Sequence, residues 1–280
     1  MHRNRGCEDR AQFAARYIQA RFPILAHPIG IVLGTGWGDV LKVDDAVGMS
    51  YRDIPGFGSL SDLEGHARQL VIGKIQGVPV CCLRGRVHLN EAPADPQLAQ
   101  MVRLQVEMLL ALGVRTLIIT SAVGGLSNGK GRPFGVGDVI AVDGFVTLYA
   151  PEMPLYAGEF CSPEDTLDPK LLLMAIEEQG KLLVRVGGHV MVRGPFFEGR
   201  RYDKRLLAAS GADVVGMSML PEACVAALYE ARVLGLGFVT NDDQETHSHE
   251  TNLVRAKASA SELGGFLERI VRRIGSSSGK

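Results

Sequence analysis

The sequence predicts an α/β protein. Short apolar runs that end in glycine or small polar residues alternate along the chain with segments of helical periodicity. The chain has 280 residues, 46% of them hydrophobic, which is enough to bury a large core in one sizeable domain or two smaller ones. Because no linker or internal repeat divides it, we expect one domain over residues 1–280, with a disordered tail over about 275–280.

Each predicted strand is a short apolar run bounded by turn residues. The predicted strands span residues 29–33, 69–74, 78–84, 117–120, 139–142, 182–192, 214–215 and 237–240. The predicted helices span residues 8–21, 95–112, 168–180, 219–234 and 263–274. Two of these helices have clear start signals, since Pro96 follows a capping Asp95 and Pro169 opens the segment that ends at Gly180.

Charge and composition exclude several classes of function. Lys and Arg number 30 and Asp and Glu 31, and no basic stripe is present, so nucleic acid is not an expected partner. No apolar run approaches the roughly 20 residues of a membrane span, and residues 1–10 lack the apolar stretch of a signal peptide. The five cysteines show no paired spacing, which fits a reducing compartment. We therefore expect a cytoplasmic protein without a membrane partner.

A glycine-rich turn follows the first predicted strand. In the run Gly34-Thr35-Gly36, the glycines let the backbone approach an anion and the hydroxyl of Thr35 adds a donor. The spacing differs from the GxGxxG of dinucleotide-binding folds. The run is therefore either an anion site or a tight turn between elements.

Basic side chains follow the predicted strand at 78–84. Arg86 and His88 are two residues apart, so they point the same way in an extended segment. The guanidinium is a bidentate fork for phosphate, the imidazole adds a donor, and Glu91 could hold one of them in place. The alternative is a solvated basic turn, but a position at a strand end favours a ligand site.

Three further segments at strand ends have the residue types of a ligand site. Small residues at 120–126 leave room for a ligand, or form a glycine turn. Glu198 follows an apolar, aromatic run; it either accepts hydrogen bonds from a heterocycle or is an exposed residue beside Arg200 and Arg201. Ser218 precedes a predicted helix, where it either meets an anion or is a plain N-cap.

Two segments contain histidines. His66 lies on a polar loop, where a surface residue is the simpler interpretation. Asn241 and Asp243 are followed by His247 and His249, a cluster that invites a metal interpretation. No third ligand has recognisable spacing, so we expect no metal site.

Taken in chain order, these motifs resemble those of the trimeric purine nucleoside phosphorylases and their methylthioadenosine phosphorylase relatives. The resemblance covers about residues 31–270 and is carried by 51–55 with 65–67, 85–88, 120–126, 194–198, 215–222, 240–241 and 249–250. It implies a single-domain α/β fold with a mixed twisted sheet, partly barrel-like and surrounded by helices, and a homotrimer. It also implies the phosphorolysis of inosine- or guanosine-type nucleosides to free base and ribose 1-phosphate.

The resemblance assigns one group of residues to phosphate. The group comprises Thr35, His66, Arg86, His88, Ser218 and the backbone of Ala122, with His66 closing a flap over the anion. Inorganic phosphate is then a co-substrate, and no cofactor is expected. On this assignment, Arg86→Ala should raise the KM for phosphate sharply and leave the fold intact.

A second group is assigned to the nucleoside. Glu198 and Asn241 would hold the base, and Met217 would pack against the ribose. His249 would reach the 5′-hydroxyl, and Phe160 would close the ribose site of a neighbouring subunit. The expected catalytic residues are Glu198, Asn241 and His88. Because Glu198 can accept from a ring N–H that only 6-oxopurines have, the assignment favours that class of base.

Four positions depart from the family's pattern. Asn90 stands where an aromatic often lies near the ribose, Ser121 replaces an Asn, and Gly199 replaces a Thr. Asp243 matches the acidic residues with which methylthioadenosine phosphorylases bind a 6-amino group. A methylthioadenosine or methylthioinosine phosphorylase is therefore the first alternative. A non-catalytic nucleoside-binding protein is the second, and an NAD-dependent dehydrogenase is a distant third.

Overall fold

A nine-stranded mixed sheet organises the computed structural model, which describes residues 5–38, 40–58, 60, 67–91, 95–156, 158–194, 199–244 and 249–277. The strands are β1 (Ile29–Leu33), β2 (Asp44–Ser50), β3 (Gln69–Ile75), β4 (Val78–Arg84), β5 (Thr116–Gly125), β6 (Val139–Val146), β7 (Val184–Met191), β8 (Val214–Gly216) and β9 (Arg232–Asn241). Their order is β2-β3-β4-β1-β5-β8-β7-β6-β9, and β9 also pairs with β5. This additional pairing closes β5, β8, β7, β6 and β9 into a barrel, which confirms the expected partly barrel-like sheet.

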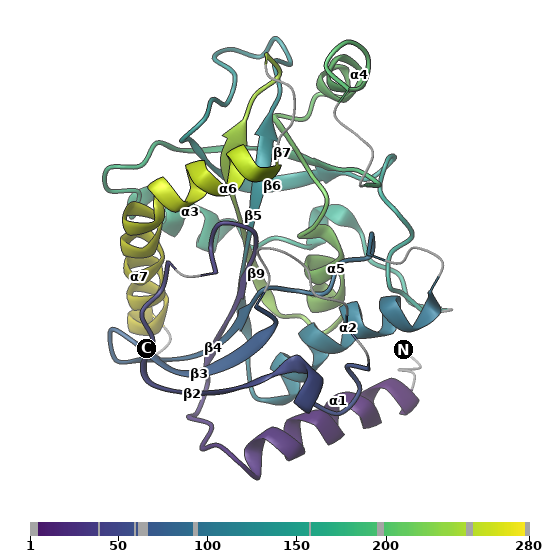
Figure 1. Cartoon of the computed structure of the whole chain (residues 1–280), viewed down its shortest axis with the longest axis vertical. Helices are drawn as coiled ribbons and strands as arrows, with labels where there is room; N and C mark the ends of the chain where they lie inside the picture. Colours follow the sequence, from purple (N-terminus) through teal and green to yellow (C-terminus); the bar gives the residue numbers. More distant parts are fainter. Residues whose placement is uncertain are drawn as a thin grey trace.

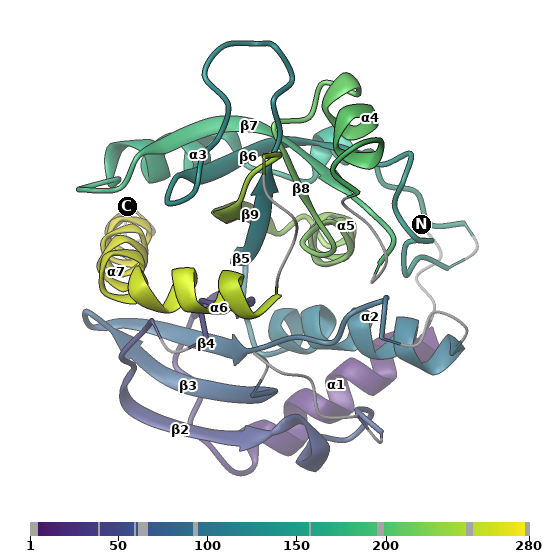
Figure 2. The same ribbon diagram turned by 45° about the horizontal axis from the view of Figure 1, so that its top comes forward.

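Helices cover both faces of the sheet. They are α1 (Arg5–Gln19), α2 (Pro96–Ala111), α3 (Pro169–Glu177), α4 (Asp203–Ala209), α5 (Leu220–Leu228), α6 (His249–Ala258) and α7 (Ala260–Ser277), with two 3-10 turns, η1 (Tyr51–Asp53) and η2 (Pro163–Asp165). The core formed with α1, α2 and α5 lies on one side of the sheet, and the core formed with α3 and α7 lies on the other (Figures 1 and 2). Successive residues of β4 alternate between the two cores, so Cys81 and Cys82 face opposite sides.

Several predicted elements have the expected limits. The structure contains strands at 29–33 and 78–84 as predicted, and a strand at 69–75. α2 begins at Pro96, and Asp95 Oδ1 accepts the Gln97 N–H at 2.9 Å, so the predicted N-cap is confirmed. None of the described helices combines the length and apolar character needed to cross a bilayer.

The predicted helix over 219–234 is wrong in its second half. α5 ends at Leu228 and β9 begins at Arg232. A Cβ at Gly235 would lie 2.7 Å from Met219 Sδ, and one at Gly237 would lie 2.7 Å from Ile140 Cγ2. The glycines therefore serve the close packing of a buried strand, which outweighs the local helical pattern.

Four other elements also differ from the prediction. α7 continues to Ser277, into the segment that we expected to be disordered from about residue 275. β2, α4 and α6 were not predicted. β2 is exposed along most of its length and so lacks the apolar alternation that marks a strand in sequence.

Candidate functional site

The candidate site residues lie on strands that are neighbours in the sheet. β1 pairs with β4, where Leu33 lies opposite Arg84, and also with β5. β5 pairs with β8 and β9, so Gly124 lies opposite both Val215 and Asn241. The parallel strands β1 and β4 end together, and the segment after the antiparallel β8 runs back along β5, so motifs that are far apart in sequence become neighbours.

The glycine-rich turn after β1 packs against the middle of β5, at Thr120. The Gly34 N–H donates to Thr120 Oγ1 at 3.1 Å. A Cβ on Gly34 would lie 2.5 Å from Thr120 O and 2.7 Å from Arg86 Nη2, so a larger residue would clash with both. The glycine thus serves close packing, and it brings the half-buried Thr35 to the ends of the strands.

Arg86 is not part of a solvated basic turn. Its side chain is 1% exposed, and Nη1 donates to Glu222 Oε1 at 2.6 Å. Nη2 donates to the carbonyl of Thr120. A buried guanidinium needs a partner charge, and Glu222 supplies it from the first turn of α5. This ion pair was not predicted from the sequence. The one sequence signal for it is that Glu222 is a lone carboxylate in an otherwise apolar helix.

Glu91 holds the backbone of His88 and does not contact Arg86. Glu91 Oε1 accepts the His88 N–H at 2.7 Å, and Oε2 accepts from the Arg68 guanidinium. The side chains of Arg68 and Glu91 are 7% and 9% exposed, so this second ion pair is also buried. The pair therefore links Arg68, just before β3, to the segment of the half-buried His88.

Met217 and Ser218 lie between β8 and α5. Ser218 is 9% exposed and stands two residues before the first residue of α5. Met219 has φ +80°, which L residues rarely adopt, and the chain turns sharply there. A Cβ on Gly194 would lie 1.9 Å from Met217 Cε, so the Met217 side chain packs directly over the segment that follows β7.

Asn241 and Asp243 have different surroundings at the end of β9. Asn241 is 2% exposed, and its Oδ1 lies 3.4 Å from Asn252 Nδ2. Asp243 Oδ2 accepts the Ser127 N–H at 3.0 Å, and Oδ1 accepts from Gln244 Nε2 at 2.9 Å. Partial burial opposes ionisation of the Asp243 carboxyl, but the hydrogen bonds from Ser127 and Gln244 outweigh it and hold its pKa below the usual range.

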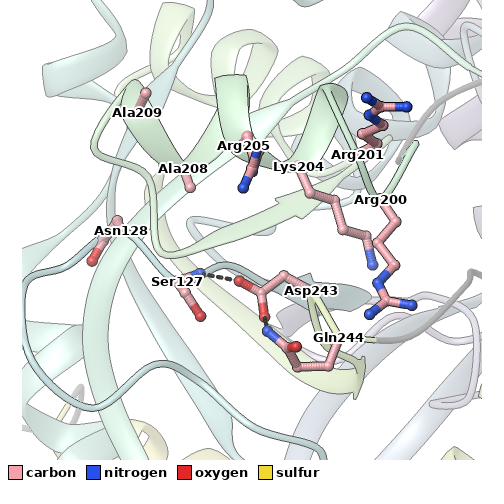
Figure 3. Close-up of a pocket in the computed structure, with 10 residues that line it drawn as sticks. All are labelled: Ser127, Asn128, Arg200, Arg201, Lys204, Arg205, Ala208, Ala209, Asp243 and Gln244. Atoms are coloured by element: carbon pink, nitrogen blue, oxygen red, sulfur yellow. Dashed lines mark hydrogen bonds between the residues drawn. The ribbon is translucent and has the colours of Figure 1, made fainter.

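A pocket of about 820 Å³ lies beside this end of β9 (Figure 3). Its lining residues are Ser127, Asn128, Arg200, Arg201, Lys204, Arg205, Ala208, Ala209, Asp243 and Gln244. α4 forms one wall, and the buried Lys204 donates through Nζ to Asp242 O at 2.5 Å. No role was predicted for this basic segment, because α4 itself was not predicted.

The predicted site residues fall into three groups. Those on or just after the neighbouring strands β1, β4, β5, β8 and β9 are Thr35, Arg86, His88, Ala122, Met217, Ser218 and Asn241. His66 and Glu198 lie outside the described residues, as does the side chain of His249, which begins α6. Phe160 is 81% exposed between β6 and α3, and Asp243 lines the pocket. Among the described residues, no three His, Cys, Asp or Glu side chains are arranged to hold a metal ion.

The fold and the arrangement of these site residues agree with one class of protein, the phosphorylases. The model of the phosphorylase superfamily matches residues 28–272. Purine nucleoside phosphorylase 1 of Bacillus subtilis is 31% identical over 277 residues, which are 94% of this chain and 97% of that protein. Purine nucleoside phosphorylase of Mus musculus is also 31% identical, over 88% of this chain and 89% of its own.

Solved structures show the same relationship. Isoform 2 of the Schistosoma mansoni purine nucleoside phosphorylase, in complex with cytosine and ribose-1-phosphate, has a TM-score of 0.82 at 26% identity over 95% of this chain and 96% of its own. The schistosoma enzyme in complex with hypoxanthine has a TM-score of 0.80 at 26% identity, over 95% of this chain and 97% of its own. The chain belongs to the phosphorylase superfamily and, within it, to the purine nucleoside phosphorylase family.

Proposed function

We propose that this protein cleaves purine nucleosides with inorganic phosphate, giving a free purine base and ribose 1-phosphate. A phosphate oxygen bonds to the anomeric carbon as the bond from that carbon to the purine nitrogen breaks, and the electron pair of the broken bond leaves with the base. The observation that carries the proposal is the meeting of buried polar side chains from distant motifs on neighbouring strands and the segments beside them, in a chain whose relatives are purine nucleoside phosphorylases.

Buried polar atoms at these strand ends support a ligand site. Within the described residues, Ser121 Oγ, Glu222 Oε2 and both amide atoms of Asn90 are buried without a hydrogen-bond partner. Buried polar atoms are rarely left in this state, and a ligand, an ion or water completes their contacts. Two of these three residues, Asn90 and Ser121, are positions at which the sequence departs from the family's pattern.

Phosphate is proposed to lie where the turn after β1, the loop after β4 and the start of α5 meet. Its ligands would be Thr35, His88, Ser218 and the backbone of Ala122, with Arg86 below and His66 closing the site. The partial positive charge at the start of α5 favours an anion there. Because Glu222 and the Thr120 carbonyl orient Arg86, its guanidinium would hold a fixed position beside the phosphate.

The base is proposed to be a 6-oxopurine held by Glu198 and Asn241. Asn241 would donate to the ring and Glu198 would accept from its N–H. Asp243 is the residue that could instead favour a 6-amino group, but each of its oxygens already accepts a hydrogen bond from Ser127 or Gln244. These engaged oxygens support the 6-oxo preference. Donors to the base would act mainly in the transition state, when negative charge builds on the leaving purine.

The assembly is proposed to be a cytoplasmic homotrimer that needs no cofactor, since phosphate is itself the nucleophile. Phe160 supports the trimer, because an aromatic side chain that is 81% exposed suits contact with another subunit. Cys81 and Cys82 are buried as free thiols, which suits a reducing compartment.

Phosphate dependence across several nucleosides tests the function. We expect inosine and guanosine to be consumed only when phosphate is present, with ribose 1-phosphate as a product. Adenosine and methylthioadenosine should have a kcat/KM at least about tenfold lower. A reversal of that order would overturn the base assignment. Tight nucleoside binding without turnover would instead identify a non-catalytic binding protein.

A further inference from the structure

We propose that the pocket between α4 and the end of β9 selects purine bases that carry a negative charge, and that xanthosine is therefore favoured over inosine. The inference rests on the proposed function and specifies its substrate class. It concerns the part of the molecule beyond Asn241, where Lys204, Arg205 and Asp243 line a cavity of about 820 Å³.

The charge of the pocket is the first argument. Four of the described lining residues are cationic, namely Arg200, Arg201, Lys204 and Arg205. Among the described lining residues Asp243 is the one carboxylate, and it accepts hydrogen bonds from Ser127 and Gln244. Cations gathered along a concave surface raise the local concentration of anions. Lys204 strengthens the effect because it is only 2% exposed, so solvent screens its charge less than it screens the exposed arginines.

The position of the pocket is the second argument. Asp243 lies two residues after Asn241, and Arg200 lies two residues after Glu198, the two residues proposed to hold the base. Lys204 Nζ donates to the carbonyl of Asp242, which directly follows Asn241. In Figure 3 the side chains of Lys204 and Arg200 are turned toward Gln244 and Asp243. A purine bound against Asn241 would therefore border the pocket.

The chemistry of the base is the third argument. Xanthosine has the 6-oxo group of inosine and a second oxo group at C2, which makes a ring N–H acidic enough to be lost near neutral pH. The resulting charge is spread over the base, and bond cleavage adds more electron density to the same ring. Cations that line the pocket would stabilise both the bound anion and the transition state. Its volume leaves room for the additional oxo group.

A graded series at Arg205 tests the inference. Arg205 is exposed on α4, so its substitution alters charge with little effect on packing. The measurement is the ratio of kcat/KM for xanthosine to kcat/KM for inosine, at low salt and about pH 8. We expect Arg205→Lys to keep the ratio, Arg205→Ala to lower it about threefold, and Arg205→Glu to lower it about tenfold.

A substitution that removes a negative charge from the pocket and a matched control outside it complete the design. Asp243→Asn keeps an oxygen for the Ser127 N–H but removes the negative charge, so it should raise the ratio about threefold. Arg272→Ala makes the same charge change as Arg205→Ala on an exposed residue of α7, away from α4 (Figures 1 and 2), and should leave the ratio unchanged. Added salt should lower the wild-type ratio.

Two results would overturn the inference: a wild-type kcat/KM for xanthosine below that for inosine, or a ratio that does not follow the charge at position 205. Equilibrium binding of xanthine and hypoxanthine, measured with phosphate present, gives the same comparison without turnover. If no nucleoside is cleaved, the proposed function fails. The preference between the two bases, and its change in the Arg205 series, still decides whether the pocket selects anions.

Discussion

Arg86 shows how burial alters what a single basic residue does. At a strand end in the sequence it resembles an accessible phosphate ligand. In the structure its side chain is almost completely buried and lies 2.6 Å from Glu222, so it also neutralises a buried carboxylate. Removal of one member of a buried pair leaves the other charge without compensation and costs about 3–5 kcal/mol. We therefore revise the expectation that Arg86→Ala leaves the fold intact.

Arg86→Ala is now expected to lower the Tm as well as to raise the KM for phosphate. The double variant Arg86→Met/Glu222→Gln removes both charges at similar volume, so it should recover most of the lost stability but none of the phosphate affinity. Thermal unfolding and phosphate kinetics on both proteins separate the two roles. A single variant as stable as the wild type would show that the pair contributes nothing to folding.

The burial of His189 should make the free energy of unfolding depend on pH. Burial lowers its pKa from 6.5 to about 4, and its ring meets Phe145 edge-on with centroids 5.7 Å apart. The unfolded chain therefore binds a proton before the native state does. Stability from this group is complete above about pH 6.5 and falls by about 3 kcal/mol as the pH drops to about 4.

His189→Leu should flatten that part of the profile, because leucine has no proton to gain. Urea unfolding of both proteins at several pH values between about 4 and 7 measures the difference. Equal slopes in the two proteins would mean that other groups cause the acid loss.

At the scale of elements, α6 is held between the turn after β1 and the end of β9. Gly36 has φ +80°, and a Cβ there would lie 2.2 Å from the Cβ of Ala256 on α6. From the same helix, Arg255 Nη1 donates to Thr240 O at 2.7 Å. The position of α6 therefore depends on a glycine at position 36, and the turn that presents Thr35 depends on α6.

Gly36→Ala should cost about 2 kcal/mol or more, because it combines an unfavourable φ with overpacking against α6. Gly38→Ala is the matched control in the same turn. Gly38 has no positive φ, and no described residue lies within 4 Å of its Cβ position, so the substitution should cost no more than about 0.5 kcal/mol. Denaturant unfolding measures both. Equal losses would show that the contact with Ala256 does not decide the geometry of the turn.

At the scale of the whole molecule, the segment before α3 is held in place at Glu159 and exposes the next side chain, Phe160. Arg103 on α2 donates through Nη1 and Nη2 to the two oxygens of Glu159, at 2.6 and 2.8 Å. The adjacent Phe160 is 81% exposed. A fixed backbone beside an exposed aromatic is typical of an interface anchor, because little entropy is lost when the aromatic is buried by another subunit.

Phe160→Ala is expected to raise the KM for nucleoside several-fold and to leave the KM for phosphate nearly unchanged, since the side chain would close only the ribose site of a neighbour. Leu148→Ala removes another exposed apolar side chain, 85% exposed, and serves as the control. Sedimentation should show a trimer for both variants. A trimeric Phe160→Ala protein with wild-type nucleoside kinetics would remove Phe160 from the site.

The sequence by itself determined the α/β class, the limits of β1 and β4, the N-cap of α2 and the family. These features follow from local periodicity, capping residues and the order of the motifs, all of which can be read without knowing which distant segments meet. The pairing of Arg86 with Glu222 joins residues 136 positions apart, and the barrel closes only through the contact of β5 with β9. The cationic pocket likewise needs α4 to lie beside the end of β9. Only the tertiary structure decided these features, because burial and charge compensation depend on which distant segments meet.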